Sequence, residues 1–243
     1  MTPLMWCMPA DKGGTFECLL RNSADPNKFL TMDFSGAGGS ESECVMLQSA
    51  LLLDAEGFAL VLEHGGDCKI TRRPDGGVPV VATYHGATPL EVALGGVAKD
   101  SITKVRLLQA KGVDITETRR GQPAAMLAVF GGHFDVALLM LDQGADCTLY
   151  DREDFRLAHR IAQCLPTEVK PMFERFGWDL LSEADQYRVL EIMKHLEKHG
   201  ESVKQATDEM IAVQHIVNAD GPDAGKELMK RFGRNEASLQ QRR

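Results

Sequence analysis

Two short patterns in the sequence contain residue types that catalysis or metal binding would need. Residues 38–42 read Gly-Gly-Ser-Glu-Ser, close to the Gly-x-Ser-x-Gly turn that exposes a serine nucleophile, but Ser42 replaces the last glycine. That turn joins a buried strand to a helix, whereas a glycine-rich run of this kind is typical of a flexible insertion. His195 and His199 lie one helical turn apart and could share a metal ion, but the third ligand is missing. We therefore expect no catalytic residue, no metal site and no cofactor.

A second group of residues is suited to recognition of another protein. Arginine pairs occur at 72–73 and 119–120, in predicted loops of an otherwise acidic chain. They are either solvated loop tips or a basic seam for an acidic partner. Arg binds carboxylates in a bidentate way, and Arg and Tyr are enriched in binding hot spots. The expected partner-binding residues are Arg72, Arg73, Tyr84, His85, Arg119, Arg120, Tyr150 and Arg152.

The composition excludes several classes of protein. The 243-residue chain has 27 Lys and Arg against 35 Asp and Glu, a formal charge of −8, and its pI is about 5.4. Nucleic-acid binding is disfavoured, because affinity for phosphate backbones comes mainly from clustered Lys and Arg. No apolar run approaches the roughly 18 residues of a transmembrane helix. The six cysteines lack disulfide-framework and zinc-site spacing, so we expect reduced thiols.

One turn signal recurs five times and determines the predicted architecture. A glycine or serine, one further residue and then Asp follow each of five apolar helical runs. Glycine ends a helix at low cost because it adopts the left-handed conformation, and Asp bonds local backbone in the turn that follows. The aspartates are Asp25, Asp67, Asp114, Asp146 and Asp179, after apolar runs at 16–20, 58–62, 105–108, 136–141 and 169–176.

Each of these units also has a predicted start for an earlier helix. Thr2 and Thr88 each precede Pro-Leu, and Pro is favourable in the first helical turn because its missing N–H leaves no donor unbonded. Weaker versions of the signal begin at Cys44, Pro123 and Arg156. Each unit is therefore predicted as helix, short turn, helix, Asp-containing turn and an extended loop, called a finger below.

This pattern resembles the ankyrin repeat, a unit of about 33 residues with Thr-Pro-Leu-His at its first helix and Gly-Ala-Asp after its second. The best matches are residues 86–90 (Gly-Ala-Thr-Pro-Leu) and 132–146, and the resemblance covers about residues 2–180. The family histidine is kept only as His159, which we expect to be a buried hydrogen-bonding residue. The resemblance implies an all-α ankyrin-repeat solenoid of about five units with a concave binding face.

The first two fingers are longer than the later ones. They span 19 and 21 residues, from Asp25 to Cys44 and from Asp67 to Thr88, against 9 and 10 in the next two units. The first insertion is apolar at 29–34 and then glycine-rich and flexible. The second, Ile70 to Tyr84, is predicted to be a β-hairpin, since β-branched residues flank Pro-Asp-Gly-Gly. Insertions in solenoids lie on one face, often the binding face.

The periodicity changes after residue 180. Apolar residues at helical spacing predict helices behind Ser182, from Val203 to about Asn218, and from Asp223 to Phe232. The expected division is an ankyrin-repeat domain at 1–180, a C-terminal helical capping region at 181–233 and a frayed tail at 234–243. A cap gives the last repeat a polar outer face.

The resemblance implies a non-catalytic module that holds a specific partner protein in its finger and groove face. The sharper expectation is a bacterial immunity protein, monomeric by itself, that neutralises a secreted toxin. The alternatives from other classes are an enzyme with a site in the fingers or the helical end, and a nucleic-acid adaptor that uses the arginine pairs. The expected compartment is the cytoplasm, or the periplasm if a leader precedes Met1 and is removed.

Overall fold

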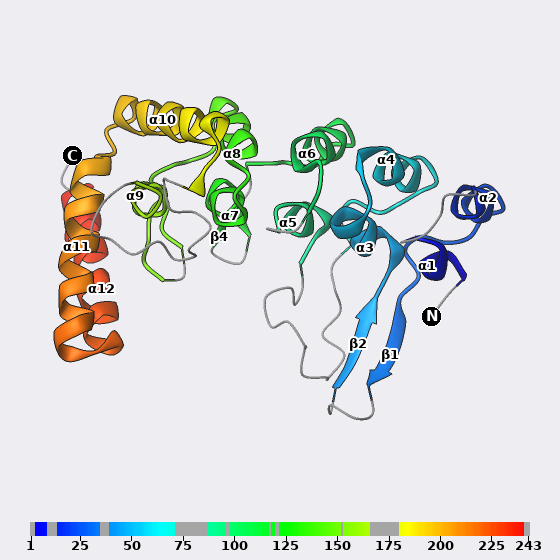
Figure 1. The fold of residues 1–243 in the computed structure, drawn as a ribbon, viewed down its shortest axis with the longest axis horizontal. Helices are drawn as coiled ribbons and strands as arrows, with labels where there is room; N and C mark the ends of the chain where they lie inside the picture. Colours follow the sequence, from blue (N-terminus) through cyan, green and yellow to red (C-terminus); the bar gives the residue numbers. More distant parts are fainter. Residues whose placement is uncertain are drawn as a thin grey trace. The chain divides into compact units, whose positions relative to one another are not determined.

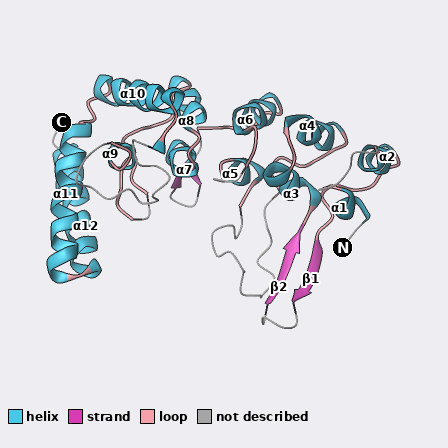
Figure 2. Cartoon of the chain, in the orientation of Figure 1, coloured by secondary structure: helices cyan, strands magenta, loops and turns pink. Residues whose placement is uncertain are grey.

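The computed structural model describes residues 3–8, 14–34, 39–70, 87–95, 98–116, 118–119, 122–151, 153–165 and 180–240. These residues form twelve helices and two short antiparallel pairs of strands, so the chain is mostly helical, as predicted (Figure 1, Figure 2). The chain divides into two compact units, Met1–Ile115 and Thr116–Arg243. The boundary expected near residue 180 lies within the second unit, where α10 and α11 pack onto α8 and α9.

Unit 1 contains three pairs of short helices. The two helices of each pair contact each other, and the second and third pairs also contact each other through α3 with α5 and α4 with α6. Because α3 has neighbours on more than one side, it is apolar around most of its circumference, with Val45, Met46 and Leu47 all buried. The helices are α1 (Pro3–Cys7), α2 (Thr15–Arg21), α3 (Val45–Leu52), α4 (Ala55–Glu63), α5 (Pro89–Ala93) and α6 (Ser101–Ala110).

The predicted starts of the first helices are confirmed. Thr88 is the N-cap of α5: its hydroxyl accepts the Glu91 N–H, and the Glu91 carboxylate accepts the Thr88 N–H at 2.7 Å. This reciprocal pair satisfies two N–H groups that a helix start leaves unbonded. In the other units, α1 begins at Pro3, and the N-caps are Cys44 of α3, Pro123 of α7 (Ala124–Gly131) and Arg156 of α9 (Leu157–Ala162).

The turn after each second helix is also confirmed where the structure describes it. The first residue of the turn adopts a left-handed φ, from +66° at Ser23 to +90° at Gly144. The side chains of Asp25, Asp67 and Asp146 each accept the N–H of the residue two positions later, at 2.8 Å. The predicted helix at 169–176 and the turn at 177–179 lie outside the described residues.

One side chain joins the first turn to the second. The Asn27 amide donates to the Gly65 carbonyl at 2.8 Å and accepts the Asp67 N–H, also at 2.8 Å. Both groups belong to the backbone of the turn that ends the second helix pair. The amide therefore links the first helix pair to the second.

The first finger is a β-hairpin rather than an apolar stretch followed by a flexible one. Strand β1 (Leu30–Phe34) pairs antiparallel with β2 (Gly39–Glu43), with Met32 opposite Glu41. Residues 30–34 alternate between apolar and polar types, which favours a strand, and the sequence between the two strands is Gly-containing. The second finger, with the hairpin predicted for Ile70 to Tyr84, lies beyond Ile70 outside the described residues.

Unit 2 contains the remaining helix pairs. Helix α7 contacts α8 and α9, α10 contacts α8, and α11 contacts both α9 and α12. In Figure 1, α7 and α8 are seen end-on while α10 and α11 run in the plane of the picture, so these C-terminal helices lie across the preceding ones. The elements are β3 (Thr118–Arg119), β4 (Gln122–Pro123), α7, α8 (Phe134–Asp142), α9, α10 (Glu183–Lys198), α11 (Val203–Asp220) and α12 (Pro222–Gln240).

The last helix is longer than predicted. We expect from the sequence an end at Phe232 and a frayed tail at 234–243, but α12 continues to Gln240. Gly233 is the only helix-weakening residue of this segment that could have stopped it, and one glycine costs a helix only about 1 kcal/mol. Residues 236–240 (Glu-Ala-Ser-Leu-Gln) mostly favour helix, so the helix has no strong stop signal before its end.

Lys104 on α6 is fully buried, an unusual position for a cation. Its Nζ donates to the Ala50 carbonyl near the end of α3 at 3.0 Å. Burial lowers the pKa of Lys104 to about 8, although the nearby carboxylates of Asp100 and Asp54 act in the opposite direction. The lysine thus ties α6 to α3 at an electrostatic cost.

The six cysteines, all within the described residues, are free thiols as predicted. Burial raises the pKa of Cys44 to about 11 and that of Cys164 to about 12, so both stay protonated at neutral pH. None of the helices in the described part of the chain is long and apolar enough to cross a bilayer.

Candidate functional site

Most of the expected partner-binding residues lie outside the described residues. This is true of Arg120 and Arg152 and of the four residues of the second finger, Arg72, Arg73, Tyr84 and His85. Arg119 lies on β3, where its backbone pairs with Gln122 of β4. Tyr150 is described and half-buried, in the finger that precedes α9.

Tyr150 has a partner inside its own chain. The Arg156 guanidinium carbon lies 5.7 Å from the centre of the Tyr150 ring, a distance at which a cation is attracted to the face of an aromatic ring. The side chain expected to anchor a partner therefore also covers a buried arginine. This contact leads to a group of charged side chains that the sequence does not reveal.

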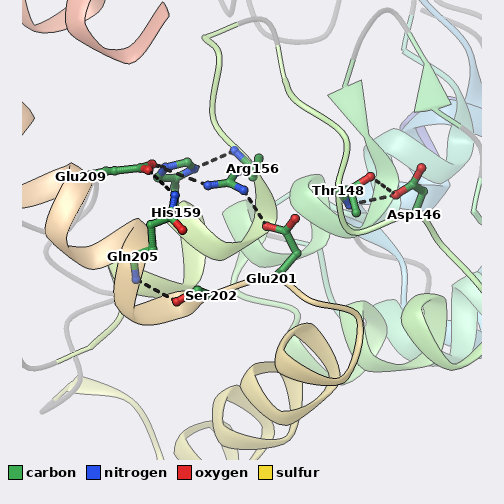
Figure 3. Close-up of polar contacts among 8 residues, drawn as sticks. All are labelled: Asp146, Thr148, Arg156, His159, Glu201, Ser202, Gln205 and Glu209. Carbon is green, nitrogen blue, oxygen red and sulfur yellow. Dashed lines mark hydrogen bonds and ion pairs between the residues drawn. The ribbon is translucent and has the colours of Figure 1, made fainter. Parts of the chain in front are cut away.

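Three charged or polar residues of the α9 segment, Arg156, His159 and Arg160, are almost fully buried. Arg156 lies between two carboxylates: its Nη1 is 3.1 Å from Glu201 Oε2 and its Nη2 is 3.6 Å from Glu209 Oε2 (Figure 3). Glu201 lies in the turn between α10 and α11, and Glu209 lies on α11. Together, Arg156, His159, Arg160, Asp151, Glu201 and Glu209 are called the charge cluster below.

His159 is a buried hydrogen-bonding residue, as predicted. Its Nδ1 accepts the backbone N–H of Arg156 at 3.0 Å, the same capping role that Glu91 has in α5. Because Nδ1 must be an acceptor there, the ring hydrogen is on Nε2, which lies 2.7 Å from Glu209 Oε2. His159 therefore caps its own helix with one nitrogen and donates to α11 with the other.

The other end of the charge cluster organises the loop before α9. The Asp151 side chain accepts the N–H groups of Glu153 and Phe155 at 2.8 and 3.0 Å, and it also binds the Arg160 guanidinium. Arg160 lies 4.2 Å from the centre of the Phe155 ring. Phe155 in turn packs against a hydrophobic cluster that includes Met210 of α11. Loop, α9 and α11 are thus connected by both polar and apolar contacts.

The His159–Glu209 pair has the residue types of an acid–base dyad but is not arranged as one. Both ring nitrogens are engaged, so neither is left to activate a hydroxyl or thiol group. The pair also lies between two packed helices rather than at an open surface, with the Glu209 side chain only 11 % exposed. This geometry holds α9 against α11, and the role of the charge cluster is to stabilise the contact between these two helices.

The contribution of Glu209 to the stability of the α9–α11 contact depends on pH. Burial alone would raise the pKa of Glu209, but hydrogen bonds from His159 and Gln205 and the charge of Arg156 outweigh it and lower the pKa below its ordinary value of 4.5. A carboxyl whose pKa is lower in the folded state stabilises the fold at neutral pH. That contribution is lost as the pH falls below 4.5 and through the lowered value.

We expect Glu209→Gln to lower the free energy of unfolding at pH 7 by about 1 to 2 kcal/mol, because the amide cannot pair with Arg156 as a charge. The difference from the unsubstituted chain should shrink as the pH falls below 4.5, which urea unfolding at a series of pH values would show. Asp208→Asn is the matched control, since Asp208 is exposed on the same helix and pairs with Lys204 at 2.8 Å. An equal loss from both substitutions would contradict the assigned role of Glu209.

The two patterns singled out for chemistry differ from the geometry that such chemistry needs. Ser40 lies within β2, opposite Asp33, and not at a turn from a strand into a helix. The rings of His195 and His199 are stacked with their centres 4.3 Å apart, and the second ring bonds the carbonyl of the first residue at 2.8 Å. Within the described ranges, no group of three His, Cys, Asp or Glu residues could hold a metal ion.

The charge cluster had a partial signal in the sequence. Arg160 takes the place that Val92 and Leu127 occupy in the two preceding units, four residues after the N-cap. A cation at a position that is apolar in neighbouring units needs a buried partner. The partners of Arg160, Asp151 and Glu153, are close in sequence. Glu201 and Glu209, the partners of Arg156, are 45 and 53 residues from it, beyond the reach of any local pattern.

Comparison with known proteins gives no further assignment. No protein-family model matches the chain, and no curated protein sequence matches it.

Proposed function

We propose that the protein is a non-catalytic protein-binding module built from ankyrin-type helix pairs. The units share one register, with an N-cap at an equivalent position before the first helix and a left-handed residue after the second. The β1–β2 hairpin carries the proposal. The next two units have fingers of only 9 or 10 residues, so the stacking of helix pairs does not require the extra length of the first two fingers. Ordering each additional residue costs about 1 to 2 kcal/mol of conformational free energy. The free energy of partner binding offsets part of that cost.

Exposed apolar side chains on first helices in each unit support the proposal. Trp6 of α1 is 69 % exposed, Leu52 at the end of α3 is 49 % exposed and Phe130 of α7 is 37 % exposed. Each belongs to the first helix of its pair, and in ankyrin-type units the first helices and fingers line the concave groove. Large apolar side chains of this kind, Trp above all, are common hot spots of protein interfaces.

In this proposal, α10 to α12 form the cap. The end of a stack of helix pairs exposes apolar surface unless another element covers it. Helices α10 and α11 contact α8 and α9, and the charge cluster fixes α11 on α9. Recognition is thereby assigned to the fingers and first helices, while the C-terminal helices stabilise unit 2.

The most specific form of the proposal is an immunity protein that neutralises a secreted toxin. The first long finger is a paired hairpin, and a loop of fixed shape fits a single dedicated partner better than a range of partners. Co-expression with the product of a neighbouring gene, followed by co-purification, would identify such a pair.

A finger replacement tests the proposal. We expect that replacing residues 30–43, which include the β1–β2 hairpin, by a Gly/Ser linker of equal length lowers the affinity for a protein captured from native lysate by at least about tenfold, since hot-spot losses exceed about 1.4 kcal/mol. The melting temperature should not change, because the helix pairs are untouched. Affinity would be measured by titrating the purified captured protein.

Tyr187→Ala with Leu190→Ala is the control for this replacement. Both residues are exposed on α10, which is neither a first helix nor a finger. Unchanged binding by a folded finger-replaced chain, with loss of binding by the α10 variant, would place the binding site on the C-terminal helices instead.

A further inference from the structure

One side of α10 has a stripe of four solvent-exposed residues. They are Glu183, Tyr187, Leu190 and Lys194. Steps of four, three and four residues keep all of them on the same side of a helix. The buried residues of α10, Val189, Ile192 and Leu196, pack into unit 2 and lie about half a helical turn away from the stripe. The stripe is therefore a second face of α10, and Figure 1 shows this helix at the margin of unit 2.

The centre of the stripe is apolar. Tyr187 is 63 % exposed and Leu190 is 43 % exposed. Single exposed apolar side chains are common on protein surfaces. Two of them separated by three residues on one helix face form a small continuous patch, and burial of such a patch is favourable. Ala184 and Met193, which flank this patch, are also apolar.

The two ends of the stripe have opposite charges. Glu183 lies in the first turn of α10, and Lys194 lies three turns later, about 16 Å along the helix axis. Lys194 Nζ binds Glu191 of the same helix at 2.7 Å, and the Lys194 side chain remains 69 % exposed. An ammonium group has three donors, so Lys194 can bind a second carboxylate. Along the helix, the stripe thus reads acidic, aromatic, aliphatic and basic.

This order is complementary to itself when it is reversed. In an antiparallel pair of identical helices related by a two-fold axis, residues equally far from the axis face each other. An axis midway between Tyr187 and Leu190 places Tyr187 of each chain opposite Leu190 of the other. The same axis places Glu183 of each chain opposite Lys194 of the other. Every facing pair in the stripe is then either apolar with apolar or acidic with basic.

We infer that a second copy of the chain covers this face, in a two-fold symmetric dimer with an antiparallel α10–α10 contact. The inference is independent of the proposed binding function, because α10 is neither a first helix nor a finger. It differs from the monomer that we expect from the sequence. One helix face buries less than the roughly 1,200 Å² of stable complexes, so the dimer is weak and its population rises with concentration.

Charge and symmetry favour this occupant over two others. In a parallel helix pair, Glu183 would face Glu183 and Lys194 would face Lys194, and like charges across an interface oppose association. A helix of an unrelated protein would need the same four residue types in reverse order. A second copy meets that requirement through symmetry, since an isologous interface uses the same patch twice.

Sedimentation velocity of the full chain tests this inference. We expect the weight-average mass to rise from that of the 26.7 kDa chain toward twice that value as the concentration increases to about 0.5 mM. Tyr187→Ala with Leu190→Ala should stay monomeric over the same range with an unchanged melting temperature, because both side chains are exposed and Ala favours helix. An unsubstituted chain that remains monomeric throughout overturns the inference, as does a double variant that still dimerises.

Charge reversal tests the antiparallel register. Glu183→Lys and Lys194→Glu should each weaken self-association about tenfold, since two symmetry-related pairs become like-charged. An equimolar mixture of these two variants should associate more strongly than either variant alone, because every facing charged pair is then of opposite sign.

Asp208→Lys and Lys204→Glu are the matched controls for charge reversal. They make the same changes of charge at exposed positions on α11, where the two residues pair with each other at 2.8 Å. Each control should dimerise like the unsubstituted chain. A mixture of the α10 variants that associates no more strongly than its components would contradict the antiparallel register. Equal weakening by the α11 controls would show a general effect of charge and would also overturn the inference.

Discussion

Arg156→Ala is expected to lower the free energy of unfolding of unit 2 by about 3 to 5 kcal/mol, the range found when one member of a buried ion pair is removed. Arg156 is the cation between Glu201 and Glu209, whose side chains are 7 % and 11 % exposed. Without it, two poorly hydrated carboxylates on the α11 side of the contact lose the cation that α9 supplies. The substitution also removes the contact with the Tyr150 ring.

Chemical denaturation of the full chain, followed by circular dichroism, measures this loss. Hydrogen exchange then locates it: amides of α9 and α11 should lose protection while those of α3 and α4 should not, since they belong to unit 1. Arg188→Ala is the control, because Arg188 pairs with Asp185 within α10 while both side chains stay partly accessible to solvent, 37 % and 29 % exposed, and such pairs contribute at most about 1 kcal/mol. A loss from Arg156→Ala no larger than that of the control would mean that the charge cluster does not stabilise the contact.

The parts of the fold that could be predicted are those encoded within a few residues. Thr88 with Pro89 specifies a helix start, and the Gly144–Asp146 turn specifies a helix end, because capping and left-handed turns depend on adjacent residue types. The repetition of these signals places the helix pairs in register. His159 could be assigned as a buried capping residue on the same basis.

The parts that could not be predicted depend on distant residues or on weak signals. The charge cluster joins residues about 50 positions apart, and no periodicity connects α9 with α11. The first finger has only a short alternating run in β1, and Gly39 to Glu43 is polar and Gly-containing, so its strand forms through pairing rather than through its own propensity. The end of α12 lies eight residues beyond the predicted Phe232, because one glycine at 233 does not stop a helix that helix-favouring residues continue.

Lys104→Met is expected to stabilise unit 1 at neutral pH, the opposite direction to Arg156→Ala. Each pKa unit corresponds to about 1.4 kcal/mol, so lowering the pKa of Lys104 from 10.5 to about 8 costs the folded state about 3 kcal/mol at pH 7. Loss of the hydrogen bond to the Ala50 carbonyl offsets about 1 kcal/mol of the gain. Asp100 and Asp54 are exposed, so they are hydrated once the lysine is removed. Lys104→Met should therefore raise the free energy of unfolding at pH 7 by about 2 kcal/mol in total.

The pH dependence separates this explanation from a simple improvement in apolar contacts. In the unsubstituted chain, the unfolded state holds the Lys104 proton up to about pH 10.5 while the folded state releases it near pH 8. Stability therefore rises between these two values, and Lys104→Met should abolish that rise. Lys111→Met removes the same charge from an exposed position at the C-terminal end of α6 and should preserve it. If Lys104→Met instead destabilises the chain at pH 7, the bond to Ala50 and the attraction of the two carboxylates outweigh the cost of burial, and the lysine is a net stabilising link between α6 and α3.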